Sequence, residues 1–245
     1  MIICGHRGLA SLAPENTLAG LQAAHQQGLS WVEIDVQLSQ DNQVVVFHDE
    51  YLDRCSNGRG QLRQHSWQQL SELDAGSWFG DEFSGERLVL LRDYLARAER
   101  LDIKVNIELK LYPEDSAAPL CQQVSRVITE GKFMPDSLLF SSFDPIALAH
   151  MQSLQPGIAR ALLVERIPDD WQLQLQRLDC RALNCNHRHL TDTQARAVSA
   201  AGYQLNCYTV NQQHKADTLA DWGVNMVFTD VALKQTPSAR NRAPS

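Results

Sequence analysis

The sequence has no apolar run long enough to cross a membrane. Its longest runs cover only a few residues, such as Val44-Val45-Val46-Phe47, whereas a spanning helix needs about 20. The residues that follow Met1 show neither the basic start nor the apolar centre of a secretory signal. We therefore expect a cytoplasmic protein with no stable membrane insertion.

The cysteines lack the spacing of a metal or redox motif. The six cysteines stand at positions 4, 55, 121, 180, 185 and 207, and no two of them form a C-x-x-C pair. Such pairs mark many structural zinc sites and thiol oxidoreductases. Free cysteines usually behave as small buried side chains, so we expect six reduced thiols in a reducing compartment.

Positive charge is in deficit. The 22 lysines and arginines are outnumbered by 29 aspartates and glutamates, which gives a formal net charge of −7. Proteins that bind nucleic acids carry a basic surface, and anionic membranes attract basic segments, so we expect neither partner. An acidic protein that handles an anion needs local positive charge from arginine, lysine or a metal ion.

Short β-rich runs alternate with amphipathic stretches along most of the 245 residues. The expected strands are Ile2–Cys4, Trp31–Val36, Val44–Phe47, Ile103–Leu109, Ser137–Ser141, Ala159–Val164, Ala182–Cys185, Gln204–Thr209 and Met226–Thr229. The expected helices are Thr17–Gln27, Leu91–Leu101, Ser116–Glu130, Pro145–Leu154, Asp192–Ala201 and Gln212–Trp222, with Asn16 and Asp144 as N-caps.

This alternation is typical of βα units around a parallel sheet. About eight units in a chain of this length indicate an α/β fold with one TIM (β/α)8 barrel, which we place at residues 1–234. The strand candidates exceed eight by one. The link from Val36 to Val44 is also too short for a helical crossover between parallel strands, so this region departs from the regular pattern.

Residues 50–90 interrupt the pattern. They are rich in glycine and contain the aromatic pair Trp78 and Phe79, and they are far longer than the usual βα loop of about two to six residues. We interpret them as a small insertion that covers the C-terminal mouth of the barrel. If it caps the mouth, Trp78 and Phe79 could line the glycerol or alcohol pocket; the alternative is that both aromatic residues belong to the core. The polar residues 235–245 are expected to form a disordered tail.

Three carboxylates fall on inward faces of two expected strands. Glu33 and Asp35 alternate with aliphatic residues, so both point to the same side, and Glu108 and Lys110 share a face in the later strand region. A solvated edge strand could explain one such face but not two. Converging carboxylates repel one another unless a cation neutralises them, and oxygen ligands suit Mg²⁺ or Ca²⁺.

Two histidines follow expected strands, where TIM barrels carry their active sites. His6 stands in Gly5-His6-Arg7-Gly8, and His48 stands in Phe47-His48-Asp49. Histidine suits proton transfer near neutral pH, and Arg7 and Lys110 supply fixed positive charge. This combination predicts the cleavage of a phosphate ester. The pair His187 and His189 has no third ligand nearby and is expected in a solvated loop.

In order along the chain, a set of segments resembles the motifs of the glycerophosphodiester phosphodiesterase family. The matching motifs are Gly5-His6-Arg7-Gly8, Ala13-Pro14-Glu15-Asn16-Thr17, Glu33-Ile34-Asp35-Val36, Val46-Phe47-His48-Asp49, Ile107-Glu108-Leu109-Lys110, Ser141-Ser142-Phe143, Tyr208-Thr209-Val210-Asn211 and Phe228-Thr229-Asp230. The chain is similar to the bacterial cytosolic branch of that family.

The resemblance implies a TIM barrel that hydrolyses glycerophosphodiesters, such as glycerophosphocholine and glycerophosphoethanolamine, to sn-glycerol 3-phosphate and an alcohol. The implied roles are His6 and His48 as general acid and base in either order, Glu33, Asp35 and Glu108 as ligands of one Mg²⁺ or Ca²⁺, and Arg7 and Lys110 at the phosphate. Glu15, Phe143 and Tyr208 are expected in or behind the pocket wall, and Tyr208 replaces a tryptophan that is common in the family.

Two other functions fit a barrel of this kind. A lysophospholipase D-type lipid phosphodiesterase needs an exposed apolar rim for an acyl chain, and the sequence shows no clear amphipathic membrane helix. A non-catalytic barrel that binds glycerophosphodiesters would have no need of both His6 and His48. The sequence leaves the metal, the attacking oxygen, the alcohol head group and the oligomeric state open.

Overall fold

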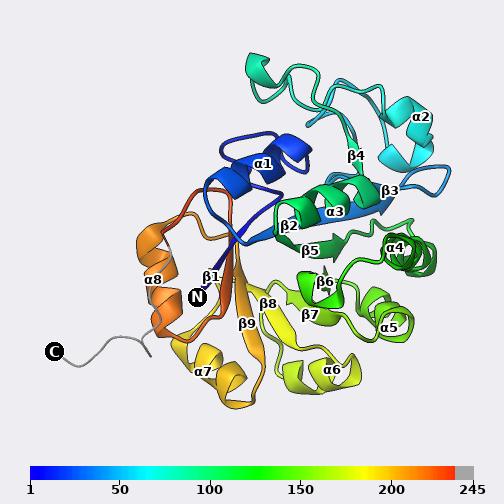
Figure 1. Ribbon diagram of the computed structural model, residues 1–245. Coiled ribbons are helices and arrows are strands. Elements are labelled where there is room, and N and C mark those ends of the chain that lie inside the picture. The colour runs from blue at the N-terminus through cyan, green and yellow to red at the C-terminus, as the bar shows by residue number, and fades with distance from the viewer. Residues whose placement is uncertain (235–245) are drawn as a thin grey trace.

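In the computed structural model, which describes residues 1–234, eight parallel strands close into a barrel (Figure 1). They are β1 (Ile2–Gly5), β2 (Trp31–Leu38), β5 (Lys104–Leu109), β6 (Leu138–Ser142), β7 (Ala159–Val164), β8 (Ala182–Asn186), β9 (Gln204–Tyr208) and β10 (Met226–Thr229). The first strand pairs with both β10 and β2, which completes the ring. The predicted TIM barrel is confirmed.

Helices surround this barrel on the outside (Figure 1). They are α1 (Leu18–Gln26), α3 (Leu91–Arg100), α4 (Ala117–Gly131), α5 (Pro145–Leu154), α6 (Trp171–Arg177), α7 (Asp192–Ala200) and α8 (Gln213–Asp221). Helix α6 is not predicted from sequence, because Trp171-Gln172-Leu173-Gln174-Leu175 alternates apolar and polar residues with the period of a strand. The aliphatic positions of β2 face the helices and are fully buried, whereas its acidic positions face the interior.

The surplus strand among the nine that were expected is Val44–Phe47, which does not belong to the barrel. Strand β3 (Val44–Val46) pairs antiparallel with β2, and β4 (Val89–Leu90) pairs antiparallel with β3. The short link that follows Val36 is therefore a hairpin connection, in which Asn42 adopts a positive φ of 58°. The hairpin returns the chain to the C-terminal end of the barrel, where Phe47 N donates to Asp35 O at 3.0 Å.

The segment between β3 and β4 carries short helical turns and a small core of its own. It contains η1 (Leu62–Gln64), α2 (Trp67–Leu70) and η2 (Asp81–Phe83), and it projects from one side of the barrel (Figure 1). Trp78 packs edge-to-face on Phe79, which packs in the same way on Phe83. Within residues 1–234, neither Trp78 nor Phe79 lines the cavity described below, so these two aromatic side chains stabilise the segment itself.

Several other features bear on the sequence-based expectations. Asp144 caps α5 as predicted, because its Oδ1 accepts from Ile146 N at 2.6 Å. Helix α1 is capped by Thr17 instead of Asn16, since Thr17 Oγ1 accepts from Gly20 N at 3.1 Å. The six cysteines are buried and unpaired. The predicted tail, residues 235–245, lies outside the described residues.

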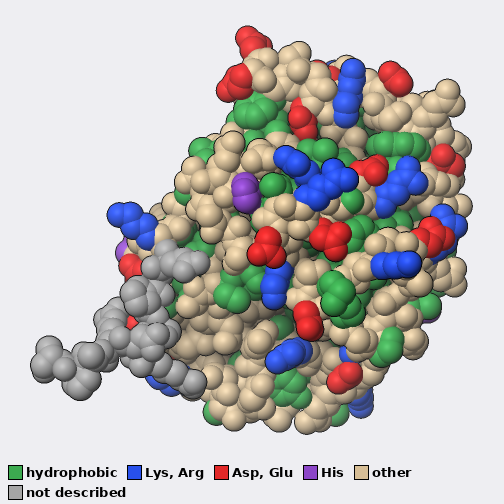
Figure 2. All heavy atoms as spheres, in the orientation of Figure 1, with side chains coloured by type: hydrophobic (Ala, Val, Ile, Leu, Met, Phe, Trp, Pro, Cys, Tyr) green, Lys and Arg blue, Asp and Glu red, His purple; other side chains and the backbone are tan. Residues whose placement is uncertain are grey.

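Charged side chains of both signs are mixed on one face of the molecule. Figure 2 shows acidic and basic side chains interspersed over the visible face of the molecule. Among residues 1–234, no helix combines the length and the apolar character that crossing a bilayer requires.

Candidate active site

A cavity opens among the C-terminal ends of the barrel strands. It has an empty volume of about 570 Å³, including the part open to solvent. Its lining residues are His6, Arg7, Glu33, His48, Asn106, Glu108, Lys110, Ser141, Phe143, Leu163, Asn184, Tyr208, Thr209 and Phe228. Most residues singled out in the sequence thus gather in one place. Asp35 and Glu15 lie behind this surface.

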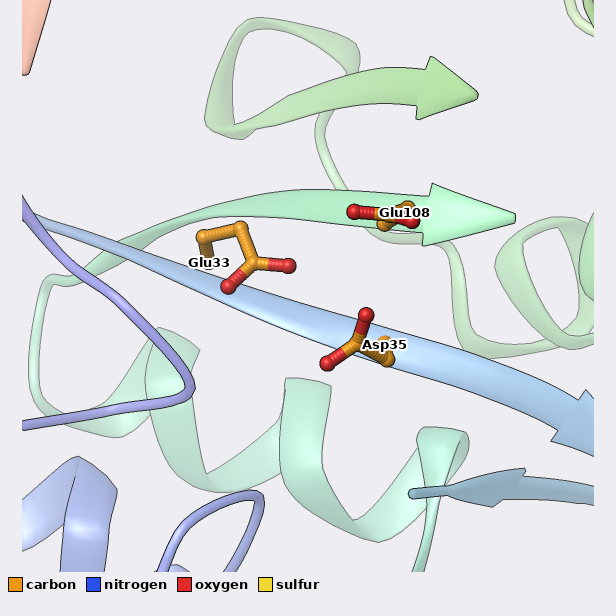
Figure 3. Close-up of side chains that lie close together, drawn as sticks. All are labelled: Glu33, Asp35 and Glu108. Carbon is orange, nitrogen blue, oxygen red and sulfur yellow. The ribbon is translucent and has the colours of Figure 1, made fainter. Parts of the chain in front are cut away.

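The three predicted metal ligands point toward one another from neighbouring strands. Figure 3 shows Glu33 and Asp35 on β2 and Glu108 on β5. Asp35 is the register partner of Glu108, and all three carboxylates offer oxygen atoms within 4.8 Å of one another. Their convergence follows from strand alternation, because inward residues of paired strands share one face.

The carboxylates carry unequal charge. Burial, together with the charge of nearby Asp35, raises the pKa of Glu33 to about 8. Burial and Asp35 also raise the pKa of Glu108. Burial would raise the pKa of Asp35 as well, but Lys110 and Arg7 outweigh it and hold that pKa well below its usual range. Without a further cation, the cluster therefore favours one ionised carboxylate over three.

This donor set fits a hard divalent cation. Glu33 Oε1 is buried and has no hydrogen-bond partner, although buried polar atoms are nearly always paired. Asp35 is oriented by Asn16, whose Nδ2 donates to Asp35 Oδ2 at 3.0 Å. Asn16, expected as a helix cap, thus serves the acidic cluster instead, and its φ is 58°. The buried acidic triad is consistent with a divalent metal site.

His6 is held by a carboxylate from the other end of the chain. Its Nδ1 lies 2.7 Å from Asp230 Oδ1, and its Nε2 lies 3.9 Å from Glu33 Oε2. Burial lowers the pKa of His6, but the hydrogen bond to Asp230 and the charge of Glu33 outweigh it, so the pKa is raised. Asn211 Nδ2 donates to Asp230 Oδ2 at 2.7 Å and fixes that carboxylate in turn.

His48 has a similar partner. Its Nδ1 lies 2.6 Å from Asp49 Oδ1, while its backbone carbonyl accepts from Tyr112 Oη at 2.5 Å and Gln37 Nε2 at 2.9 Å. Burial lowers the pKa of His48, and Lys110 and Arg7 lower it further against the opposite effect of Asp35. Both histidines are thus oriented by a carboxylate at Nδ1, and neither Nε2 is used for that contact.

A second layer of charge connects His48 with Arg7. Arg54 donates to Asp49 through Nε at 2.5 Å and Nη2 at 2.8 Å, and to both oxygens of Glu15 at 2.8 Å. Arg7 Nη1 donates to Glu15 at 2.7 Å. Glu15 therefore lies between two guanidinium groups.

Asp49, Asp230, Asn211 and Arg54 were not assigned a role from sequence, although Asp49 directly follows His48 in its motif. Asp230 and Asn211 stand inside matched motifs, and an acid directly after the last strand is a signal that could have found Asp230. Arg54 has no comparable local signal, because its partners are defined by the fold of the segment after β3.

The two expected phosphate-binding cations lie against the carboxylates. Lys110 Nζ is 2.6 Å from Glu108 Oε1 and 3.3 Å from Asp35 Oδ1, and Arg7 Nε is 3.5 Å from Asp35 Oδ2. Arg7 occupies a tight turn after β1, with a φ of 55°, and its backbone N donates to Glu33 Oε2 at 3.0 Å. Both cations face the cavity, where an anion would meet them.

Phe143 and Tyr208 form one wall of the cavity. Their ring centroids are 6.1 Å apart in an edge-to-face arrangement, and Tyr208 Oη donates to Val164 O at 2.9 Å. His187 and His189 follow β8 in a turn, and His189 Nε2 lies 3.1 Å from Glu165 Oε1. In the described chain, these two histidines do not line the cavity.

Comparisons with known proteins agree with this geometry. The Glycerophosphoryl diester phosphodiesterase family profile matches residues 6–234. A phosphodiesterase of Oleispira antarctica, solved with the product sn-glycerol-3-phosphate, is 38% identical, with 94% of this chain and 93% of that chain covered and a TM-score of 0.90. A glycerophosphodiester phosphodiesterase of Caldanaerobacter subterraneus is 29% identical, with 94% of this chain and 93% of that protein covered. The structure of a glycerophosphodiester phosphodiesterase from Agrobacterium tumefaciens is 27% identical, with 95% and 97% of the two chains covered and a TM-score of 0.80. The chain therefore belongs to the glycerophosphoryl diester phosphodiesterase family of phosphoric diester hydrolases.

Proposed function

We propose that this protein hydrolyses small glycerophosphodiesters, such as glycerophosphocholine and glycerophosphoethanolamine, to sn-glycerol 3-phosphate and an alcohol. One observation carries the proposal. Two histidines, each paired with a carboxylate at Nδ1, line one cavity with two cationic side chains and with Glu33 and Glu108, two members of the cluster of three carboxylates. Acid–base groups, an acidic metal site and positive charge are what phosphodiester cleavage requires.

In this proposal, Glu33, Asp35 and Glu108 hold one Mg²⁺ or Ca²⁺. When bound, the cation neutralises the carboxylates and polarises a phosphoryl oxygen. Arg7 and Lys110 hold the phosphate and offset the negative charge that grows on its oxygens in the transition state. Both side chains are about one-sixth exposed, at 16%, so their charges act with less screening than at the surface.

His6 and His48 move the protons. The attacking hydroxyl, from water or from the glycerol moiety, must lose a proton, and the leaving alkoxide must gain one. When the two imidazole rings are neutral, Asp230 and Asp49 hold the proton of each ring on Nδ1, so that Nε2 is available as acceptor. One ring takes the proton of the nucleophile, and the other, protonated ring gives its proton to the leaving oxygen.

Exposed apolar residues at the mouth favour a second substrate class. Leu12, Phe143 and Ile146 stand in loops or a first helical turn after barrel strands, and they are 46%, 50% and 62% exposed. Such a rim could receive an acyl chain. The second candidate is therefore a lysophospholipase D-type reaction, in which a lysophospholipid replaces the deacylated diester.

A direct assay tests the proposal. Protein stripped with EDTA should release glycerol 3-phosphate from glycerophosphocholine or glycerophosphoethanolamine only after Mg²⁺ or Ca²⁺ is restored. Release from lysophosphatidylcholine alone would assign the second candidate. Folded protein that binds a glycerophosphodiester but cleaves neither class with any ion would instead indicate a non-catalytic barrel.

A further inference from the structure

The interior of this barrel is polar directly below the carboxylates. TIM-barrel interiors are filled mainly by valine, isoleucine and leucine. Here four buried side chains form two hydrogen-bonded pairs, each across two neighbouring strands: Asn106 with Ser141 (β5 and β6), and Asn184 with Asn206 (β8 and β9). None of them is more than 1% exposed. We call these four residues the polar floor.

One member of the polar floor, Asn106, lies one level deeper than Glu108, whereas Ser141 is the register partner of Glu108. Asn106 precedes Glu108 by two residues on β5, and it is the register partner of Glu33. Two residues along a strand span about 6.6 Å. Lys110 Nζ lies 2.6 Å from Glu108 Oε1, so Asn106 is within reach of a small molecule whose phosphate meets this ammonium group at the level of Glu108.

The hydrogen bonds within the floor leave two atoms free. Asn106 Nδ2 donates to Ser141 Oγ at 2.9 Å, and Asn206 Nδ2 donates to Asn184 Oδ1 at 2.9 Å. Asn106 Oδ1 and Asn184 Nδ2 are buried without a partner, and both asparagines line the cavity. Turning the Asn106 amide over exchanges its oxygen and nitrogen but still leaves one amide atom unpaired. Asn184 is held in its orientation, because turning it alone would set its Nδ2 against Asn206 Nδ2, and both are donors.

The free atoms indicate what the floor can bind. An unpaired amide acceptor and an unpaired amide donor suit a neutral group that both donates and accepts, and a hydroxyl does so. A phosphate, which only accepts, is drawn instead to Arg7 and Lys110 and repelled by Glu33. Within the glycerol moiety, the terminal hydroxyl oxygen lies farthest from phosphorus, so it is the group that meets the floor when glycerol points into the barrel.

We propose that the polar floor binds the terminal hydroxyl of the glycerol moiety and thereby selects glycerophosphodiesters over diesters of simpler alcohols. The inference rests on the proposed function. A site with buried polar groups rejects an analogue that lacks the matching hydroxyl more strongly than an apolar pocket rejects a missing methylene, because the groups of the site are left unpaired.

The test compares two substrates that differ by one hydroxyl. One is glycerophosphoethanolamine, and the other carries propane-1,2-diol in place of glycerol, which keeps the hydroxyl next to the phosphate-bearing carbon. We expect wild-type kcat/KM to favour the glycerol diester by about 100-fold, within the range seen for hydroxyl recognition. Asn184→Leu, a nearly isosteric change, should remove most of this preference by lowering only the value for the glycerol diester.

Asn186→Leu is the matched control. Asn186 lies two residues further along β8, and its Nδ2 already donates to Glu165 Oε1 at 2.9 Å, so this variant should keep the wild-type preference. Asn106→Leu tests a second residue of the floor and should reduce the same preference. Thermal melting checks that each variant folds. Calorimetry with glycerol 3-phosphate and propane-1,2-diol phosphate gives the same comparison without turnover.

The outcomes separate the two proposals. Equal wild-type values for both diesters, or an equal loss of both in Asn184→Leu and Asn106→Leu, would overturn hydroxyl recognition by the floor and indicate a structural role or a bound water. If the wild-type protein cleaves neither diester with any cation, the proposed function itself fails. In that case calorimetry still decides whether the floor distinguishes the two phosphates.

Discussion

His6 Nδ1 and Asp230 Oδ1 lie 2.7 Å apart although 224 residues separate them in the chain. The contact exists because β1 and β10 are neighbours in the closed barrel, with Gly5 opposite Thr229. His48 and Asp49 repeat the same pairing with adjacent residues, 2.6 Å apart. The protein thus presents two imidazoles with similar carboxylate support, one created by barrel closure and one by local sequence.

Asp230→Asn should impair catalysis without unfolding the protein. An amide can turn its nitrogen toward His6 Nδ1, which favours the tautomer with the proton on Nε2 and removes the acceptor. We expect kcat to fall by about 10²- to 10⁴-fold, with a much smaller change in KM. Asp221→Asn, on the exposed end of α8, is the control. A kcat within a factor of two of wild type, by steady-state kinetics, would refute this role.

His6→Ala and His48→Ala should each lower kcat by about 10²- to 10⁴-fold and leave cation binding intact. Because the two histidines act on the same reaction, the double variant should lose far less than the product of the single losses. Kinetics with calorimetric titration of the cation measures both properties, and His25→Ala on exposed α1 surface is the control. Loss of cation binding in either variant would instead place that histidine in the metal site.

The acidic cluster could be predicted from sequence because it depends on local rules. Alternation places Glu33 and Asp35 on one face of β2, and a parallel neighbour with the same alternation brings Glu108 to them. The prediction needed only the strand period and the assumption of a barrel. The eight barrel strands were found for the same reason, since each is a short β-rich run.

Features that depend on non-local geometry could not be predicted in this way. Val44–Phe47 was expected to be a further strand, but so short a run does not reveal that it turns back antiparallel on β2. His48 reaches the cavity through this hairpin. The partnership of Arg54 with both Asp49 and Glu15 spans 39 residues and leaves no periodic signal. The two-residue β4 is too short for any pattern.

Arg54→Gln should reduce activity although Arg54 does not line the cavity. Its guanidinium joins Asp49 to Glu15, and through them it orients His48 and Arg7. We expect kcat to fall about 10- to 100-fold, and Arg54→Lys to recover little, because an ammonium group cannot reproduce the planar fork that bridges two carboxylates.

A readout specific to this role is rescue by added guanidinium ion. Guanidinium should partly restore Arg54→Ala and should not raise the rate of His48→Ala. Arg59→Gln is the control, since Arg59 pairs only with Asp53 in the residues described and is largely exposed. Wild-type kcat in Arg54→Gln, or the same decline in Arg59→Gln, would contradict a positioning role.

The cation and a proton should compete for Glu33. Burial raises the pKa of this carboxyl to about 8 in the folded protein, against about 4.3 in an unfolded chain. Between these two values the folded state binds a proton that the unfolded state has lost, so this group makes the metal-free protein less stable as pH rises through that window. A bound Mg²⁺ or Ca²⁺ takes over the role of the proton. The increase in Tm on adding the cation should therefore be larger at pH 8 than at pH 6.

Glu33→Gln tests the origin of that pH dependence. The amide cannot ionise, so the variant should bind the cation more weakly and should show a smaller difference in Tm increase between pH 6 and pH 8. Glu72→Gln, in the segment after β3 and remote from the cluster, should behave as wild type. Differential scanning fluorimetry with and without EDTA measures the shifts. An equal Tm increase at both pH values in the wild-type protein would mean that Glu33 is already ionised before the cation binds. The nearby positive charge would then lower the pKa of Glu33 by more than burial raises it.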